Sequence, residues 1–150
     1  MKLTVSKLNN FLLFKLPSAF FCGVRVKEID VNKCVVSVKH RWINQNPFNS
    51  MYFAVQAMAA ELSTGALVMF QIAKSGRKIS MLVANNKGNF TKFFFVRITF
   101  TCNDGHLIEK AILETIATGE GQTFWMKSIG TNETGIQVSE MDFEWSVRVK

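Results

Sequence analysis

Residues 46–73 form the longest apolar stretch of the chain, and Glu61 is the only charged residue in it. The stretch is long enough for one extended helix, and its apolar side chains would fall on every side of that helix, so the rest of the chain has to wrap around it. An ionised carboxylate in such surroundings is strongly disfavoured unless hydrogen bonds or an ion pair compensate for lost water. Glu61 is therefore either held by local hydrogen bonds or kept for chemistry.

The beginning of this helix has two candidate positions. Asn46 stands before Pro47, an arrangement that suits an N-cap followed by the first helical turn. Asn49 and Ser50 offer the alternative N-cap. Capping alone would explain an asparagine at position 46, whatever further role it has.

The chain has the size and composition of one folded domain, residues 1–150. It is 48% hydrophobic, has two prolines, and shows no linker, low-complexity tract or repeat of fixed period. Its three cysteines form no CxxC pair, and no histidine lies at metal-ligand spacing, so we predict neither disulfides nor a metal site. Reduced thiols in the cytoplasm are the expectation.

The net charge of +7 would suit several anionic partners but selects none of them. The sequence contains no glycine-rich phosphate loop and no nucleic-acid recognition motif, so we expect no nucleic-acid partner. The basic N-terminus does not fit a cleaved signal, because Lys15, Pro17 and the bulky Phe20 interrupt it. Glu61 and Gln56 argue against a membrane-spanning helix. We expect no membrane partner.

Hydrophobic period predicts the remaining elements. Residues 6–20 favour a short helix that ends near Pro17, and residues 23–30 and 33–42 favour a β-hairpin. Residues 78–102 read as one strand or two, with a bend near Gly88. A second helix is predicted over 105–117, followed by two strands around the TNETG turn. The fold class is α+β, with a largely antiparallel sheet and one buried helix.

This order of elements resembles the hotdog fold, in which a curved antiparallel sheet wraps around one central helix. The helix region resembles the phenylacetate-type acyl-CoA thioesterases of that superfamily, whose motif places an asparagine, a histidine, two glycines, a carboxylate and a further glycine at fixed spacing. On this chain the motif falls on Asn46, Tyr52, Phe53, Ala54, Glu61 and Gly65. The asparagine, the carboxylate and the last glycine match, whereas Tyr52, Phe53 and Ala54 replace the histidine and the two glycines. The segments LPSAFFCGVRV, NPF and AAELSTG, with the helix before the last two strands, resemble a less characterised bacterial branch more closely.

The resemblance implies an acyl-CoA thioesterase-like protein. Glu61 would be the base or nucleophile, with Asn46 as a second catalytic candidate, and the helix start near residues 52–54 would polarise the thioester carbonyl. Tyr52 and Glu61 are about 13 Å apart along a helix, too far to act on one carbonyl. The resemblance resolves this by placing the site between the subunits of a homodimer or tetramer. No cofactor is implied, since a coenzyme A thioester would be the substrate.

A purely structural role is an alternative at each of these positions. Glu61 could bond to Ser63 or Thr64, Tyr52 could simply pack, and Gly65 could serve only close approach of helix and sheet. Ser80, on the strand after the helix, is a substrate-contact candidate whose face depends on register. The protein could also be a non-catalytic hotdog protein that binds acyl or aromatic ligands, because three motif positions are replaced. A hydratase is disfavoured by the lack of a histidine near the helix start.

Overall fold

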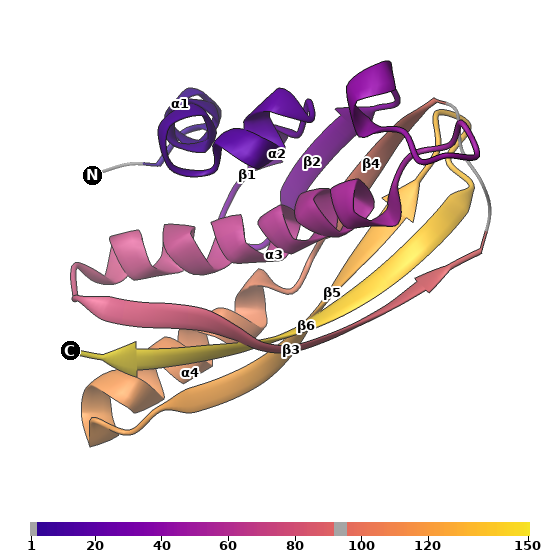
Figure 1. Cartoon of the computed structure of the whole chain (residues 1–150). Coiled ribbons are helices and arrows are strands. Elements are labelled where there is room, and N and C mark those ends of the chain that lie inside the picture. The colour runs from indigo at the N-terminus through magenta and orange to yellow at the C-terminus, as the bar shows by residue number, and fades with distance from the viewer. Residues whose placement is uncertain (1–2, 92–95) are drawn as a thin grey trace.

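The computed structural model describes residues 3–91 and 96–150. Their helices and strands follow one another along the chain as shown in Figure 1: α1 (Val5–Lys15), α2 (Pro17–Phe21), β1 (Arg25–Ile29), β2 (Cys34–Lys39), the 3-10 turn η1 (Trp42–Asn44), α3 (Phe53–Ser75), β3 (Ile79–Phe90), β4 (Arg97–Cys102), α4 (Gly105–Thr118), β5 (Gln122–Thr131) and β6 (Gln137–Val149). The predicted α+β class is confirmed.

The strands among these residues form one antiparallel sheet in the order β1-β2-β4-β5-β6-β3. The predicted hairpin is β1–β2, and its turn is closed by the Asp30 carboxylate, which accepts hydrogen bonds from the Asn32 and Lys33 N–H groups. The region predicted as one strand or two contains β3 and β4, which lie at separate places in the sheet. Residues 92–95 of that region lie outside the described part. The bend precedes Gly88, as an irregularity between Val83 and Asn85.

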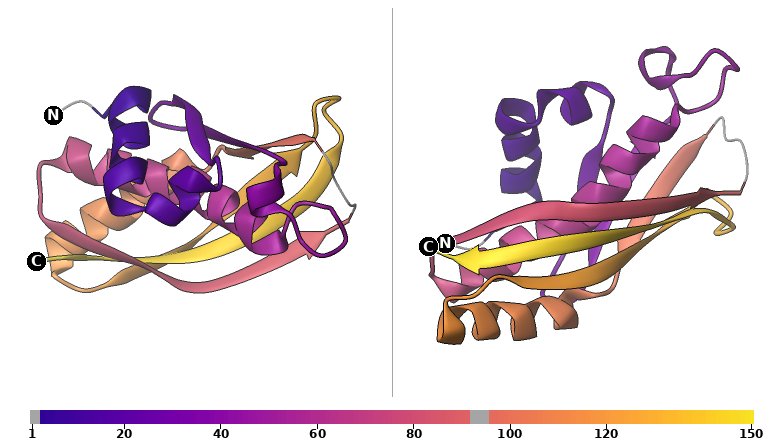
Figure 2. Two further views of the ribbon diagram at one scale, coloured as in Figure 1. Left: turned by 45° about the horizontal axis from the view of Figure 1, so that its top comes forward. Right: turned by 60° about the horizontal axis from the view of Figure 1, so that its bottom comes forward.

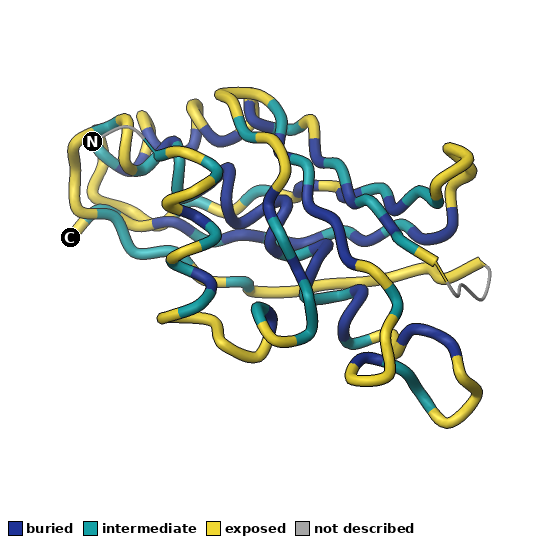
Figure 3. Tube along the Cα trace, turned by 90° about the horizontal axis from the view of Figure 1, so that it is seen from above, coloured by how far each residue is buried: buried dark blue, intermediate teal, exposed yellow. Residues whose placement is uncertain are grey.

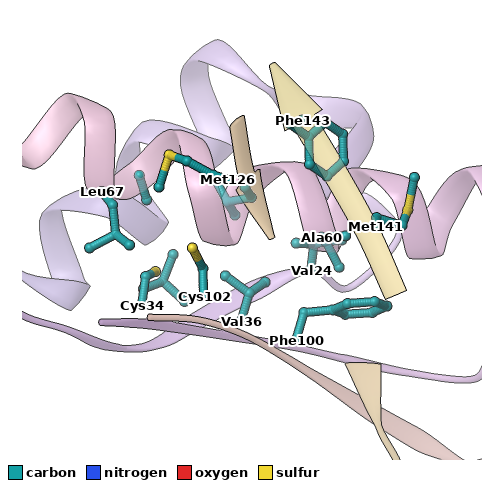
Figure 4. Close-up of a cluster of buried hydrophobic side chains, with 14 of the residues drawn as sticks. Val24, Cys34, Val36, Ala60, Leu67, Phe100, Cys102, Met126, Met141 and Phe143 are labelled. Atoms are coloured by element: carbon teal, nitrogen blue, oxygen red, sulfur yellow. The ribbon is translucent and has the colours of Figure 1, made fainter. Parts of the chain in front are cut away.

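The sheet curls around α3, as predicted for a helix that is apolar on every side (Figures 1 and 2). Side chains from both halves of the sheet meet the helix: Val36 and Phe100 come from β2 and β4, and Met126 and Phe143 come from β5 and β6 (Figure 4). Buried residues accordingly concentrate on α3 and the inner strands, and exposed ones on turns and ends (Figure 3).

Two of the three cysteines lie in this core, directly opposite each other on neighbouring strands. Cys34 and Cys102 are partners in the β2–β4 register, and both are free thiols, as is Cys22. Burial raises the pKa of the Cys34 and Cys102 thiols to about 12. They therefore pack as small apolar side chains rather than as reactive thiolates.

The N-terminal helix predicted over residues 6–20 is two helices. Leu16 leaves helical geometry with φ −133°, and Pro17 then starts α2 in the first-turn position that proline favours. Leu8 and Leu12 bury one side of α1 against the core. The predicted second helix is α4, which ends at Gly119 with φ +76°, a left-handed conformation suited to glycine.

The beginning of α3 differs from both predicted positions. The helix begins at Phe53, after an N-cap at Tyr52 that makes no side-chain capping bond. Asn46 instead closes a loop: its side-chain oxygen accepts from the Phe48 and Ser50 N–H groups, and its amide nitrogen donates to the Ser50 hydroxyl. An asparagine before proline satisfies backbone donors equally well in such a turn, so the N-cap prediction for Asn46 was wrong.

At 23 residues, α3 is long and apolar enough to cross a membrane by length and composition, and it alone is so among the helices of residues 3–91 and 96–150. Most of its apolar window is buried inside the protein. The sheet therefore supplies the apolar surroundings that this helix requires.

Candidate functional site

Two hydrogen-bonded attachments fix the helical turn that carries Glu61. The Trp145 indole N–H donates to the Thr64 hydroxyl at 2.9 Å, and that hydroxyl donates to the Glu61 carbonyl at 2.8 Å. One residue earlier, the Ser63 hydroxyl lies 2.7 Å from the Ser128 hydroxyl and donates to the Ala60 carbonyl. All four side chains are buried. The middle of α3 is thus held to β5 and β6 in one orientation.

Gly65 makes room for this arrangement. A Cβ at position 65 would stand 3.0 Å from the Trp145 ring and 3.3 Å from Oε1 of Glu61, closer than most Cβ contacts in proteins. The missing side chain therefore lets the Glu61 carboxylate and the Trp145 indole both approach α3 closely at position 65. The predicted close approach of helix and sheet at Gly65 is present.

The Glu61 carboxylate is half-buried, and no described residue donates a hydrogen bond to it or pairs with it as an ion. Ser63 and Thr64, the local partners considered from sequence, donate to backbone carbonyls instead. Burial raises the pKa of Glu61 to about 7. Glu61 is therefore a carboxylate whose pKa is close to neutrality and that has no hydrogen-bond or ion-pair partner among the described residues.

Glu61 lies on a stripe of α3 that the rest of the chain does not fully cover. Ala54, Ala57 and Met58 precede Glu61 at helical spacing and are also half-buried. Next to α3 in sequence, β3 is an edge strand that pairs only with β6 among the described residues. An apolar stripe with one carboxylate is thus left open in the single chain.

A pocket of about 450 Å³ opens at the beginning of α3. Its walls come from the loop before the helix, the first helical turn and the end of β3, and it is lined by Asn46, Pro47, Phe48, Ser50, Met51, Tyr52, Phe53, Gln56, Phe90 and Thr91. The Phe53 ring lies edge-on to both Tyr52 and Phe90, at centroid distances of 5.1 and 6.1 Å. This is an aromatic cavity with few polar groups, as in many small-molecule sites.

Backbone donors face the same end of the helix. Among the described residues nothing accepts a hydrogen bond from the Phe53 or Ala54 N–H, whereas the Val55 and Gln56 N–H groups donate to the Tyr52 carbonyl. The positive end of the helix dipole adds to these free donors. An oxygen that develops negative charge would be stabilised here.

The structure divides the predicted site residues into three places. Asn46, Tyr52 and Phe53 line the pocket and Ala54 follows them, while Glu61 and Gly65 lie together about 12 Å further along the helix. Ser80 joins neither group. It pairs with the exposed Arg148, to whose carbonyl it donates, while its neighbour Met81 packs on the core. Ser80 thus lies on the outer face of the sheet, away from both groups.

Seven of the ten residues that line the pocket were not among the predicted site residues, and Gln56, Phe90 and Thr91 are three of them. Gln56 is buried, and its amide bonds to no described residue, so it is free for a ligand. A polar residue one turn into an apolar helix was the available signal for it. Phe90 and Thr91 reach the pocket from the far end of β3, which only tertiary structure reveals. Across residues 3–91 and 96–150 no three His, Cys, Asp or Glu side chains are grouped to hold a metal ion.

Solved structures with the same fold span nearly the whole chain. A protein of unknown function from Chlorobaculum tepidum TLS, OLEI01261, matches with TM-score 0.85 at 12% identity, over 99% of each chain. PA5026 from Pseudomonas aeruginosa, described as a protein of unknown function and probable thioesterase, matches with TM-score 0.82 at 21% identity, over 100% of this chain and 99% of that one. Thioesterase HI1161 from Haemophilus influenzae matches with TM-score 0.76 at 11% identity, over 99% and 93%.

No curated protein sequence matches the chain. The model of one protein family does match, over residues 6–147, and its description is a domain of unknown function, DUF4442. Nearly the whole domain is covered by this match, and the thioesterases above have the same arrangement of sheet and central helix. The chain therefore belongs to the DUF4442 family and has the hotdog-like fold of thioesterases.

Proposed function

We propose that the protein hydrolyses acyl or aryl thioesters of the coenzyme A type in a site completed by a second copy of the chain. The observation that carries the proposal is the Glu61 carboxylate, which has a pKa near 7 and no local partner and lies on the open stripe of α3. The thioesterase names of the structural neighbours support the same class of reaction.

The pocket at the start of α3 would hold the thioester. Its aromatic walls suit an acyl or aryl group, and the Phe53 and Ala54 N–H groups would donate to the carbonyl oxygen as it becomes negative. The Gln56 amide would offer one further polar contact, and Asn46 would hold the loop that forms the outer wall.

Glu61 would supply the reaction with its base. The carboxylate accepts a proton from water as the water oxygen attacks the thioester carbon. The tetrahedral intermediate then breaks its C–S bond, and the departing sulfur takes the proton from Glu61. The alternative is direct attack by the carboxylate on the carbonyl carbon, which breaks the C–S bond, expels the thiolate and leaves a mixed anhydride on Glu61. Water then cleaves the anhydride, which releases the acid, restores the Glu61 carboxylate and frees a proton for the thiolate. Both routes require ionised Glu61, so turnover should rise with pH through about 7.

A second chain is needed because Glu61 and the free N–H groups of its own helix are about 12 Å apart. Pairing of two β3 edges would continue the sheet and bring the uncovered stripes of two α3 helices together. Exposed apolar side chains at the end of β3 and at the start of α3, among them Phe90 and Phe53, would be covered by such contact. Glu61 of one chain would then face the helix start of its partner.

The test follows the release of free thiol from a panel of short, long and aryl acyl-CoA esters. Glu61→Gln should reduce turnover at least about 100-fold, the usual range for loss of a general base. Glu109→Gln, an exposed carboxylate on α4, is the matched control and should leave turnover unchanged. Turnover that persists in Glu61→Gln would exclude the proposed role of that residue.

Two substitutions at position 53 separate the contribution of the Phe53 N–H to turnover from that of the Phe53 ring. Phe53→Pro removes the N–H and the ring, whereas Phe53→Ala removes only the ring. Proline fits this first helical position, because Tyr52 has the extended conformation (ψ 133°) that a residue before proline prefers. We expect turnover in Phe53→Pro to fall well below that in Phe53→Ala. Equal turnover would remove the Phe53 N–H from the mechanism.

Mixing experiments test the shared site. Two inactive variants, Glu61→Gln and Phe53→Pro, should recover part of the activity when co-assembled, because one mixed site then has both intact halves. If a verified mixed dimer recovered no activity, Glu61 and the Phe53 N–H would have to act within one chain.

The second candidate is a non-catalytic protein that binds acyl or aromatic ligands. It is favoured by Tyr52, Phe53 and Ala54 in place of the histidine and glycines of the thioesterase motif. Binding of non-hydrolysable acyl-CoA analogues without turnover of any ester would identify this function instead.

A further inference from the structure

Positive charge is concentrated in the first sixty residues. They contain eight Lys and Arg residues against two carboxylates, Glu28 and Asp30, whereas the remaining ninety contain ten against nine. The first sixty residues build α1, α2, β1, β2 and η1. Figures 1 and 2 show α1, α2 and η1 together along one side of the molecule, across α3 from β3, β5 and β6. Most of the net charge is therefore carried by the first sixty residues, +6 (eight minus two) against +1 (ten minus nine) for the rest of the chain.

Two arginines meet where α2, β1 and η1 join. Arg25 donates to the Phe20 and Val24 carbonyls, both at 2.7 Å, and its guanidinium lies 3.7 Å from the Phe20 ring centroid. The Arg41 guanidinium covers Gly23, where a Cβ would find no room. Desolvation, together with repulsion from Arg41, lowers the pKa of Arg25. No carboxylate in the described part of the chain pairs with either arginine.

A hydrogen bond holds exposed apolar side chains beside this pair. The Asn44 amide donates to the Cys22 carbonyl and so attaches η1 to the end of α2. Phe21, Trp42 and Ile43 flank that attachment and are 60%, 82% and 52% exposed. Large aromatic side chains this open to water, grouped beside unpaired cations, mark an interaction surface rather than ordinary surface.

We propose that this arginine–aromatic surface, formed by Phe21, Arg25, Arg41, Trp42 and Ile43, docks the protein on an anionic phospholipid bilayer. Guanidinium groups bind phosphate oxygens in bidentate fashion, and tryptophan favours the boundary between lipid headgroups and acyl chains. A second copy of the chain does not fit this surface, because a two-fold contact between two such surfaces would bring four guanidinium groups together with no carboxylate to pair with them. This proposal departs from the expectation of no membrane partner; that expectation was argued from the lack of a spanning helix, which surface docking does not need.

The test uses the full-length protein and vesicles, and needs no enzymatic activity. Sedimentation with vesicles of phosphatidylcholine alone is compared with vesicles of equal parts phosphatidylcholine and phosphatidylglycerol. We expect binding to the anionic vesicles that weakens as salt is added. Arg25→Gln with Arg41→Gln should lower the partition coefficient about 25-fold, since each basic residue near the surface contributes about fivefold. Arg41→Gln alone, which leaves the bonds of Arg25 in place, should lower it about fivefold.

Tryptophan fluorescence reports the depth of contact. Anionic vesicles should shift the wild-type emission to the blue, and Trp42→Phe should abolish the shift, because Trp145 is buried and Trp125 lies on β5. The matched control is Lys110→Gln with Leu113→Ser on α4, which removes one cation and one exposed apolar side chain elsewhere and should bind as wild type does.

Three results would overturn the proposal: equal binding to both vesicle types, unchanged binding of the double arginine variant, or no binding to anionic vesicles at low salt. Protein that ignores vesicles but binds adenosine 3′,5′-bisphosphate through Arg41 would also overturn it, since the surface would then serve a soluble phosphate.

Discussion

The middle and the beginning of α3 are built in opposite ways. Around Glu61, two buried hydrogen-bonded attachments and one glycine fix the helix against β5 and β6. At Phe53 the helix starts without a side-chain cap, beside an open aromatic pocket and a loop held mainly by Asn46. The Glu61 carboxylate therefore lies in the part of α3 that is fixed to the sheet, which we call the rigid part. The pocket lies at the open beginning of α3 and its loop, which we call the adaptable part. In the proposed thioesterase, such a division would place one reactive group accurately and accept varied acyl groups.

The largest expected effect on stability comes from the ionisation of Glu61, in the rigid part of α3. Below about pH 4.5 Glu61 is protonated in folded and unfolded chains alike and has no effect on stability. Because the pKa of Glu61 in the folded chain is raised to about 7, the free energy of unfolding falls as the pH rises from 4.5 to about 7, by up to about 3 kcal/mol. Glu61→Gln should therefore be more stable than wild type above pH 7 and equal to it below pH 4.5, as measured by urea unfolding.

The control for this pH effect is Glu114→Gln, an exposed residue of α4. It should show no such dependence. If Glu61→Gln gave the same gain at both ends of the pH range, the ionisation of Glu61 would not be the cause.

Gly65→Ala tests the close packing beside the carboxylate. The new methyl group would meet the Trp145 ring at 3.0 Å and Glu61 at 3.3 Å, and both neighbours are fixed, so we expect a loss of about 2 kcal/mol in the free energy of unfolding. Gly121→Ala is the matched control, since its Cβ would have only one distant neighbour, at 3.9 Å. Chemical denaturation of the two variants compares them directly. A neutral Gly65→Ala would show that the middle of α3 can move.

Trp145→Phe removes one attachment while keeping most of the ring. The Thr64 hydroxyl then loses a buried donor, which should cost about 1 to 2 kcal/mol. Trp125→Phe, at a half-exposed site on β5, should change stability by less than about 0.5 kcal/mol. Loss of turnover beyond the loss of folded protein in Trp145→Phe would show that this attachment also orients Glu61.

The rigid part was far easier to predict from sequence than the adaptable part. A single carboxylate in an apolar helix identified Glu61, and the spacing to Gly65 identified the turn that accommodates it. These signals are local, because helical period relates residues four apart. The hairpin and α4 followed from equally local patterns.

The pocket depends on contacts that no local pattern contains. Asn46 before Pro47 has the same sequence signature whether it caps a helix or closes a turn, and its bonds to Phe48 and Ser50 decide between them. Phe90 joins the pocket across more than thirty residues of chain. The face on which Ser80 lies could not be predicted, because alternation along a strand gives two faces and only the register with Arg148 selects one.

The smallest expected effect on stability concerns the loop before α3 that Asn46 closes. Asn46→Ala removes the acceptor of the Phe48 and Ser50 N–H groups, and because Phe48 is exposed, water replaces part of the loss, so we expect about 1 kcal/mol. Asn49→Gly, at φ +60°, relieves a left-handed residue of the same loop and should be neutral or slightly stabilising. Because the loop forms the pocket wall, Asn46→Ala should raise the KM for thioesters more than it lowers kcat. A lower kcat with unchanged KM would instead mean that the Asn46 amide acts on the reacting carbonyl, and the beginning of α3 would then be as exact a part of the site as Glu61.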